Sequence, residues 1–348
     1  MPLKEDLFLK EILEQPQALR TTMKRWLQGA AEASVREKLG KRRPPLVVFT
    51  GMGSSLNACL PACAYLNQQG IAAVALESAE LLYYYPALHA PENLLVVVSQ
   101  SGESVEPVRL METLQDRVPA ISLTNGLENT IARRSRLALD MYAGPELTVS
   151  SKTYVCAQLA LFLLACAISG SPIDKSGLEE TIGSLETFFD GWRARIQPLV
   201  DMVQPCDYLS LLGRGPSLAS ALDGAQTLKE AGHRLAEAVS GGQFRHGPLE
   251  IVSPRYGYIV FPGHSQTRDL MLRLGKDIAG YGARLAFIGN GDAPRIPGAV
   301  WIPAGPSNSY LLPILEIVPV QLLAWSLASL EGRTVDGFAK MGKVVRTE

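Results

Sequence analysis

The stretch Leu46-Val47-Val48-Phe49-Thr50-Gly51-Met52-Gly53-Ser54-Ser55 decides the fold class. A short apolar run ends in a glycine-rich turn, and a helical pattern begins directly after the turn. Short buried strands that pass through a tight turn into a helix are typical of a parallel sheet covered by helices on both faces. The first half of the chain contains four such strand candidates, at Leu46–Thr50, Ala72–Glu77, Leu94–Ser99 and Ala120–Thr124.

The second half of the chain repeats this scheme at an offset of about 163 residues. Gly51–Ser55 is echoed by Gly213–Ser217, Ile121–Gly126 by Ala286–Gly291, and Gln158–Ala160 by Gln321–Leu323. Three echoes in the same order indicate a duplicated α/β unit. The sequence therefore predicts an α/β protein of two tandem, doubly wound, parallel-sheet domains of the flavodoxin-like or Rossmann-like kind.

Helix breakers and polar stretches divide the chain into expected domains. Gly170-Ser171-Pro172 ends an apolar helix, and a more polar amphipathic helix then leads to the next strand near Tyr208–Leu212. We expect an N-terminal helical segment at residues 1–30, a first domain at 31–172, a linker helix at 173–204, a second domain at 205–335 and a C-terminal tail at 336–348.

Charge and hydropathy limit the partners of this chain. Its 348 residues carry 33 Lys and Arg against 34 Asp and Glu, which predicts no nucleic-acid surface and no polybasic membrane patch. The N-terminus has no apolar signal core. The uncharged stretch Thr153–Ile173 approaches the length of a membrane span, but it contains the polar Gln158. The corresponding apolar stretch near the C-terminus contains Glu316 and Pro319. These residues favour two buried core helices. We therefore expect a cytoplasmic protein without a membrane partner.

The cysteines indicate neither a disulfide framework nor a metal site. None of the five belongs to a CxxC pair, and none has a histidine at metal-ligand spacing. We expect reduced thiols and no bound metal. The five are Cys59, Cys63, Cys156, Cys166 and Cys206.

Three hydroxyl-rich segments of the first half each stand where a helix is expected to begin. They are Gly53-Ser54-Ser55, Ser99-Gln100-Ser101-Gly102-Glu103-Ser104 and Ser150-Ser151-Lys152. The loops that follow parallel strands meet at the carboxyl edge of the sheet, where ligands bind. Backbone amides at a helix start favour an anion, and hydroxyls add neutral donors. The three segments together predict a phosphate site that needs no metal.

Two other interpretations of these segments remain open. The serines could act only as N-caps, a position that serine prefers in any helix. Alternatively, Gly51 and Gly53 after one strand, with Glu77 at the end of the next, could belong to a dinucleotide site. Leu56 at the third glycine position argues against a dinucleotide site, and the loop at 99–104 has no role in one.

Four segments resemble the sugar isomerase (SIS) family, in particular the isomerase portion of glucosamine-6-phosphate synthase. They are Lys10–Pro16, Gly53–Asn57, Ser99–Ser104 and Arg245–Leu249. The resemblance extends from about Lys10 to Glu348 and includes the stand-alone aminosugar-phosphate deaminases and the fructosamine-6-phosphate deglycases. It implies two SIS-type domains in an enzyme that binds a small-molecule sugar phosphate without a cofactor.

The resemblance also implies the residues of the site. The phosphate and the sugar would be held by Gly53, Ser54, Ser55, Ser99, Gln100, Ser101, Ser104 and Ser151. Glu230 would be the general base, His246 the ring-opening group, and Lys343 the tail lysine that closes over the sugar. Members of the family place this site at a homodimer interface, so His246 would come from the neighbouring subunit.

These residue types suit the transfer of a carbonyl between C1 and C2 of a sugar phosphate. A carboxylate takes the carbon-bound proton and returns it to the neighbouring carbon, while a histidine opens the sugar ring. A lysine stabilises the developing oxyanion. Without the resemblance, Glu230 could be a surface acid, His246 a turn residue and Lys343 a solvated tail residue.

Three positions differ from the synthase pattern. Thr227 replaces a lysine, Gln243 replaces a glutamate, and Asp336-Gly337-Phe338-Ala339 replaces Asp-x-Pro-Arg. We expect isomerisation or isomerising deamination of an aminosugar 6-phosphate such as glucosamine 6-phosphate. Because Gln243–Glu250 resembles the deglycases, deglycation of a fructosamine 6-phosphate is the alternative activity. A non-catalytic sugar-phosphate sensor is the alternative from another class.

Overall fold

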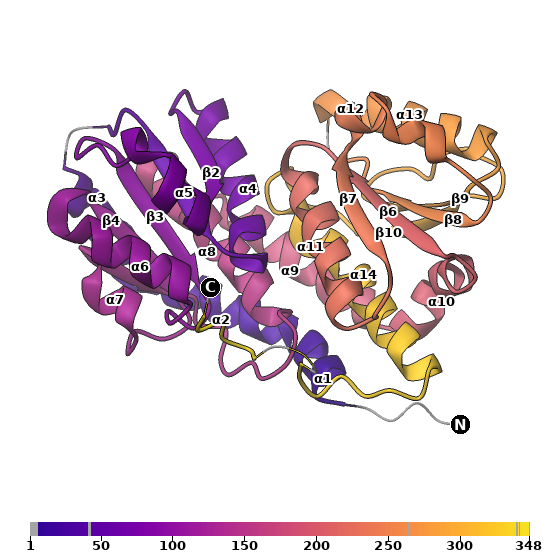
Figure 1. The fold of residues 1–348 in the computed structure, drawn as a ribbon, viewed down its shortest axis with the longest axis horizontal. Coiled ribbons are helices and arrows are strands. Elements are labelled where there is room, and N and C mark those ends of the chain that lie inside the picture. The colour runs from indigo at the N-terminus through magenta and orange to yellow at the C-terminus, as the bar shows by residue number, and fades with distance from the viewer. Residues whose placement is uncertain (1–5, 41–42, 264, 339, 341, 348) are drawn as a thin grey trace. The chain divides into compact units, whose positions relative to one another are not determined.

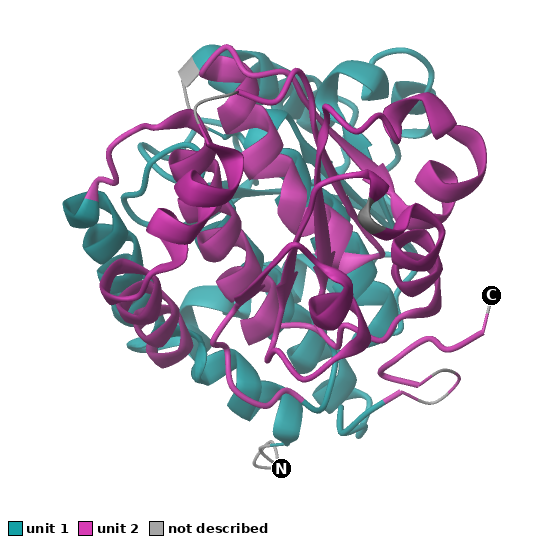
Figure 2. Ribbon diagram, turned by 90° about the vertical axis from the view of Figure 1, so that its left-hand side faces the viewer, with its two compact units in different colours: residues 1–16, 147–149, 175–337 teal, residues 17–146, 150–174, 338–348 magenta. Residues whose placement is uncertain are grey.

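The computed structural model of the chain describes residues 6–40, 43–263, 265–338, 340 and 342–347 (Figure 1). The chain forms two compact units that interleave along the sequence (Figure 2). Unit 1 consists of residues 1–16, 147–149 and 175–337, and unit 2 of residues 17–146, 150–174 and 338–348. Each unit contains one sheet.

The sheet of unit 2 has five parallel strands in the order β2-β1-β3-β4-β5. They are β1 (Val47–Gly51), β2 (Ala73–Glu77), β3 (Leu94–Ser99), β4 (Ala120–Thr124) and β5 (Leu137–Asp140). Strands β1, β3 and β4 are buried along their whole length, which explains their continuous apolar sequences. The four strands predicted from the sequence are confirmed to within one residue at each end.

Helices pack on both faces of this sheet. On one face, Val48, Leu95 and Val97 contact residues of α5, α6 and α7 in a single hydrophobic core, and α4 and α8 pack together on the other face. The helices of unit 2 are α2 (Gln15–Gln28, beginning in unit 1), α3 (Ala31–Leu39), α4 (Ser54–Gln68), α5 (Ser78–Tyr84), α6 (Val105–Leu114), α7 (Thr130–Arg134) and α8 (Lys152–Ser169), with short 3-10 turns η1 (Pro86–Leu88) and η2 (Gln115–Arg117).

The sheet of unit 1 has five parallel strands in the order β10-β9-β8-β6-β7. They are β6 (Tyr208–Gly213), β7 (Ala236–Ser240), β8 (Tyr256–Val260), β9 (Arg284–Gly289) and β10 (Val300–Pro303). In both sheets the first strand pairs with the second strand on one side and with the third on the other. The duplicated, doubly wound α/β architecture predicted from the sequence is therefore confirmed.

The second sheet also alternates with helices. They are α1 (Leu7–Leu13), α9 (Lys175–Phe189), α10 (Trp192–Val203), α11 (Leu218–Glu230), α12 (Gly241–Phe244), α13 (Arg268–Gly280) and α14 (Leu312–Leu330), with 3-10 turns η3 (Gly215–Ser217), η4 (Pro248–Ile251) and η5 (Ser265–Thr267).

Two helices, α8 and α14, are long and apolar enough to span a membrane by length and composition. In each helix, 94% of the apolar stretch that could span a membrane is buried inside the protein. A helix that is apolar on all sides fits such a position, because every face meets other protein. Both are buried core helices, as expected from the sequence, α8 in unit 2 and α14 in unit 1.

The segment Lys10–Pro16, which carries part of the family resemblance, has structural contacts within unit 1. The buried Glu11 carboxylate accepts hydrogen bonds from the backbone of Leu147 at 2.5 Å and of Thr148 at 3.2 Å. The buried Gln15 side chain donates to the Oε1 atom of Gln321 on α14 at 2.6 Å. These contacts attach the N-terminal helices to residues 147–149 and to the core helix of the unit.

Glu316 is a fully buried acid at the start of α14. Its two carboxyl oxygens accept hydrogen bonds from the hydroxyls of Ser217 and Ser220, at 3.0 and 2.6 Å. Burial raises the pKa of this carboxyl to about 7, and the two hydroxyls only partly oppose the shift. The folded protein therefore retains a proton here at pH values where the unfolded chain has released it.

This raised pKa predicts that stability falls as the pH rises. The contribution of the protonated Glu316 to the free energy of unfolding is complete below the ordinary pKa of the acid and is lost as the pH rises through about 7. We expect a loss of about 2–3 kcal/mol in the free energy of unfolding between pH 5 and pH 8 from this group. Glu316→Gln, which stays neutral and can still accept hydrogen bonds, should remove that dependence.

Urea unfolding of wild type and Glu316→Gln at pH 5, 6.5 and 8 measures the effect. The variant should be the more stable protein at pH 8, and the difference should shrink toward pH 5. Glu237→Gln, at an exposed acid of the same unit, is the matched control and should leave the slope unchanged. A difference between wild type and Glu316→Gln that does not depend on pH would contradict the prediction.

Candidate functional site

The first loop of the candidate site joins β1 to α4 in unit 2. Gly51 ends the strand, and a Cβ atom at this position would lie 2.8 Å from the carbonyl oxygen of Val98 on the adjacent β3. Gly53 has a φ of 51°, in the left-handed region that favours glycine. Glycine at both positions lets the loop pass close to β3 and deliver Ser54 and Ser55 to the first turn of α4.

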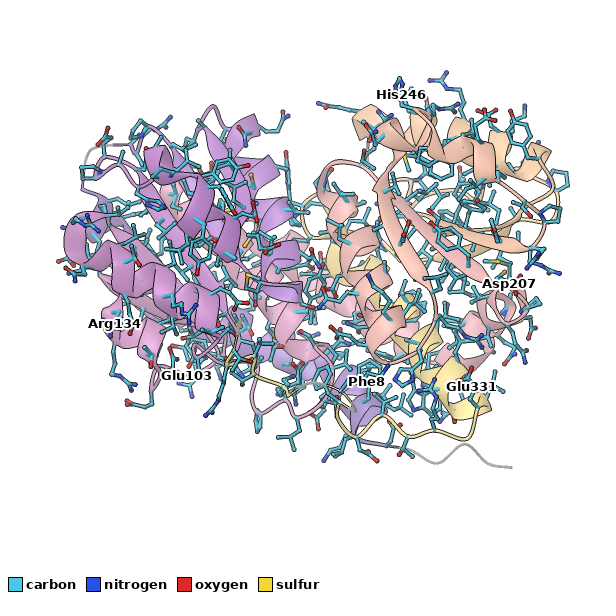
Figure 3. All side chains as sticks on the ribbon, in the orientation of Figure 1. Phe8, Glu103, Arg134, Asp207, His246 and Glu331 are labelled. Atoms are coloured by element: carbon cyan, nitrogen blue, oxygen red, sulfur yellow. The ribbon has the colours of Figure 1, made fainter. Side chains whose placement is uncertain are left out.

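The second loop joins β3 to α6 and contains the Ser-Gln-Ser-Gly-Glu-Ser sequence. The hydroxyl of buried Ser99 accepts a hydrogen bond from the backbone of Gly102 at 3.1 Å, and Ser101 accepts one from Glu103 at 3.1 Å. The Glu103 carboxylate (labelled in Figure 3) accepts from the backbone and hydroxyl of Thr130 at 2.7 and 2.9 Å. The acid of the loop is therefore engaged at the start of α7.

These two loops follow adjacent parallel strands, β1 and β3. The chain leaves β1 for β2 on one side of it, whereas β3 lies on the other side. In open α/β sheets, a ligand binds at the carboxyl edge where the strand order reverses in this way. The sequence prediction that both loops lie at one edge of the sheet agrees with this topology.

Several polar groups in these loops have no partner within the described chain. Among the residues that the structure describes, no hydrogen bond engages the hydroxyls of Ser54, Ser55 and Ser104 or the side-chain amide of Gln100. Helices α4, α6 and α8 also have no side-chain hydrogen bond at their N-caps. N-capping therefore does not account for Ser104 and Ser151, and the unengaged hydroxyls of Ser54, Ser55 and Ser104 suit an anion.

The third segment, at the start of α8, is organised by Glu146. Its Oε1 atom accepts hydrogen bonds from the backbone of Ser151 at 2.9 Å and of Thr153 at 3.0 Å. The other oxygen, Oε2, accepts from the Thr153 hydroxyl at 2.6 Å and lies 2.7 Å from the Nζ atom of Lys343. The tail lysine proposed from the resemblance thus lies beside the segment that contains Ser151.

The C-terminal tail touches the second loop as well. The carbonyl oxygen of Val345 accepts a hydrogen bond from the backbone of Val105, the first residue of α6 after Ser104, at 3.1 Å. Lys343 and Val345 stand two residues apart in the tail. The structure therefore brings the Ser99–Ser104 loop, the Ser151 segment and Lys343 together in unit 2.

Glu230 and His246 both belong to unit 1, and the fold places them far apart within it. Glu230 is the last residue of α11, which runs from the carboxyl edge of the second sheet back to its amino edge over about 20 Å. Strand β7 then returns to the carboxyl edge, where His246 follows α12 and is exposed (Figure 3). The two residues do not meet within one chain.

Sequence reasoning missed Glu146. It is one of 34 acids in the chain, and no local pattern distinguishes it. Its importance comes from complete burial of the side chain and from a partner 197 residues away. An acid a few residues before a hydroxyl-rich helix start was the only available signal.

Burial suppresses the reactivity of two of the cysteine thiols. Burial raises the pKa of Cys63 to about 11 and that of Cys156 to about 12, so both thiols stay protonated at neutral pH. All five cysteines are free, and no group of acids, histidines and cysteines suited to a metal ion occurs in the part of the chain that the structure describes.

Gly102 offers a test of how tightly the second loop is built. Its φ is 64°, and a Cβ atom here would overlap the side chain of Asn129, whose Oδ1 atom caps α7. Gly126→Ala, at a φ of 95° with open space around it, should cost only about 1–2 kcal/mol. Gly102→Ala should cost about 1–3 kcal/mol more, because the overlap adds to the backbone strain.

Urea unfolding of the two variants gives the stability difference. Calorimetric titration with fructose 6-phosphate should then show weaker binding for Gly102→Ala only. Equal stability and equal binding in the two variants would mean that the loop tolerates displacement.

The fold and these loops define a doubly wound α/β protein with a cluster of hydroxyl-rich loops at the switch point of its first sheet. Residues 43–168 match the SIS domain. The family resemblance stated from the sequence is thereby confirmed.

Known proteins are similar to this chain over nearly its whole length. Glutamine–fructose-6-phosphate aminotransferase (isomerizing) of Pyrococcus horikoshii is 29% identical over 351 residues, which cover 99% of this chain and 58% of that protein. The C-terminal domain of glucosamine-fructose-6-phosphate aminotransferase from Francisella tularensis superimposes with a TM-score of 0.83 at 22% identity, covering 96% of this chain and 98% of that one.

Glucosamine-6-phosphate deaminase from Thermotoga maritima has a similar fold, with a TM-score of 0.78 at 23% identity, over 97% of this chain and 99% of that one. Both structural likenesses establish the fold. The chain spans little more than half the length of the first two curated relatives, 58% and 53%.

Proposed function

We propose that the protein is an enzyme that isomerises or deaminates an aminosugar 6-phosphate such as glucosamine 6-phosphate. The observation that carries the proposal is the cluster of unengaged serine hydroxyls at the switch point of the first sheet, beside the ammonium of Lys343. Neutral hydroxyl donors suit a phosphate group, and the nearby acids Glu103 and Glu146 are already hydrogen-bonded. The names of the relatives point to the same class of substrate.

In this proposal the phosphate binds the Ser99–Ser104 loop with Ser54 and Ser55, and Ser151 and Lys343 face the sugar. Glu230 moves the proton between C1 and C2, and Lys343 stabilises the oxyanion that develops on the carbonyl oxygen. His246 opens the sugar ring. Since Glu230 and His246 lie at opposite edges of one sheet, we propose a homodimer in which each site takes His246 from the neighbouring subunit.

Deglycation of a fructosamine 6-phosphate is the second candidate, and Thr227 favours it. This threonine lies on α11 one turn before Glu230 and is buried. The synthase pattern has a lysine at this position. A neutral side chain beside the proposed base would not repel the ammonium form of an amine substituent, as a lysine would.

Product analysis separates the candidates. The protein is incubated with glucosamine 6-phosphate and with a fructosamine 6-phosphate, and ammonia, free amine and ketose phosphate are assayed separately. Ammonia or ketose phosphate from glucosamine 6-phosphate supports the first candidate, and free amine from the fructosamine supports the second. Binding of both compounds without any product would overturn both enzymatic proposals and support a sugar-phosphate sensor.

A further inference from the structure

Glu146 combines complete burial with an unusual number of polar contacts. Its side chain has no exposed surface, and each of its two oxygens has partners of its own. Oε1 faces the backbone amides of Ser151 and Thr153, with the Ser151 hydroxyl at 3.3 Å. Oε2 faces the Thr153 hydroxyl and the ammonium of Lys343. One carboxylate therefore joins the helix start of α8 to the C-terminal tail.

Burial makes this carboxylate depend on its partners. A buried carboxylate is costly unless it is paired and hydrogen-bonded, and loss of one member of a buried ion pair destabilises the other. The four contacts to Ser151 and Thr153 neutralise no charge, because amides and hydroxyls are neutral donors. Lys343 supplies the only cation that contacts Glu146 among the described residues. Docking of the tail is therefore energetically coupled to Glu146.

The tail that Glu146 docks lies against the loops of the candidate site. Lys343 is held at Glu146 on one side, and Val345 is held at the N-terminus of α6 on the other. Residues 343–345 of the tail therefore connect Glu146, which holds the Ser151 segment, to the start of α6 directly after Ser104. The side chain of Lys343 is 23% exposed, so its ammonium can still reach a bound molecule.

We propose that Glu146 is a positioning residue that docks the C-terminal tail and sets Lys343 at the sugar-phosphate site. The inference rests on the proposed function for its catalytic consequence, but the docking itself does not. The competing explanation is that Glu146 only caps α8, in which case Lys343 is an incidental neighbour.

Glutamine at position 146 separates these two roles. Glu146→Gln keeps an oxygen that can accept from the amides of Ser151 and Thr153, so the start of α8 is preserved. The amide nitrogen that replaces Oε2 is a donor and repels the ammonium of Lys343. The substitution therefore removes the contact to the tail and little else.

The first experiment measures docking in the protein without substrate. Competitive acetylation with acetic anhydride, read by mass spectrometry, compares Lys343 with Lys340, an exposed tail lysine that has no ion-pair partner among the described residues. Lys343 should react at least about 5-fold more slowly than Lys340 in wild type, because its amine is held against a buried carboxylate and its side chain is only 23% exposed. In Glu146→Gln the two rates should become equal. Equal rates already in wild type would overturn the proposal.

The second experiment is a double-mutant cycle on turnover, using the substrate found by product analysis. Glu146→Gln should lower kcat about 10-fold with KM changed less than about 3-fold, because a displaced lysine mainly affects the transition state. In a Lys343→Met background, Glu146→Gln should have no further effect on kcat. If Glu146→Gln lowers kcat by the same factor in the Lys343→Met background as in wild type, the proposal is overturned and Glu146 is only a helix cap.

The two experiments distinguish this inference from the proposed function. If no sugar phosphate is turned over, the acetylation comparison still decides whether Glu146 docks Lys343. If turnover occurs but acetylation does not respond to Glu146→Gln, the function stands and the positioning role is wrong.

Discussion

Glu230→Gln is expected to lower turnover by at least about 100-fold while binding of the sugar phosphate stays nearly unchanged. The carboxylate is the proposed base for the carbon-bound proton, and glutamine cannot accept that proton. The Oε1 atom of Glu230 accepts a hydrogen bond from Gln226 at 2.8 Å, and the oxygen of glutamine can accept it as well. The variant should therefore fold normally. Steady-state kinetics and calorimetric titration measure the two effects separately.

Glu237→Gln is the matched control for this variant. Glu237 is an exposed acid of the same unit, and it accepts a hydrogen bond from Tyr208 at 3.0 Å that glutamine can also accept. The control should retain wild-type turnover. Comparable turnover in Glu230→Gln and wild type would remove Glu230 from the mechanism, and loss of binding in Glu230→Gln would assign it to substrate recognition instead.

The double variant Ser101→Ala with Ser104→Ala is expected to weaken binding of a sugar phosphate by about 100-fold or more. Each hydrogen bond to a charged group contributes about 1.5–3 kcal/mol, and two such bonds would be lost. The free sugar lacks the phosphate, so its binding should change less than about 3-fold. Calorimetric titration with fructose 6-phosphate and with fructose compares the two ligands directly.

Ser34→Ala, on α3 of the same unit, is the control for the double variant and should bind both ligands as wild type does. The hydroxyl of Ser101 also accepts from the backbone of Glu103, so circular dichroism and urea unfolding should accompany the titrations. An equal loss of affinity for fructose and fructose 6-phosphate would show that the serines do not bind the phosphate.

Strand β5 shows where sequence patterns fail to predict the fold. The first four strands are apolar runs followed by small-residue turns, and each is recognisable from adjacent residues. Leu137–Asp140 has only four residues at the edge of the sheet and is mostly half-buried. Its register against β4, with Ile121 opposite Leu137, comes from packing in the finished sheet. A short edge strand carries too little periodicity to be distinguished from a loop.

The candidate site divides in the same way. The serine loops were predictable because a strand-to-helix turn requires particular residues locally. Gly53, for example, has a positive φ that favours glycine. The contact of Glu146 with Lys343 was not, since it joins residues 197 positions apart. The placement of Glu230 and His246 at opposite edges of one sheet also depends on the direction of α11 and β7 rather than on their spacing of sixteen residues.

From the amino-acid sequence alone follow the strand-turn-helix units, their duplication, and the edge of the first sheet that carries unengaged hydroxyls. These features depend on backbone conformation and on the apolar pattern of neighbouring residues, which the sequence contains directly. The tertiary structure alone decided which acid is buried, which cation neutralises it, and which loops the C-terminal tail touches. Burial and ion pairing arise only when distant segments exclude water together, so no local stretch of sequence can specify them.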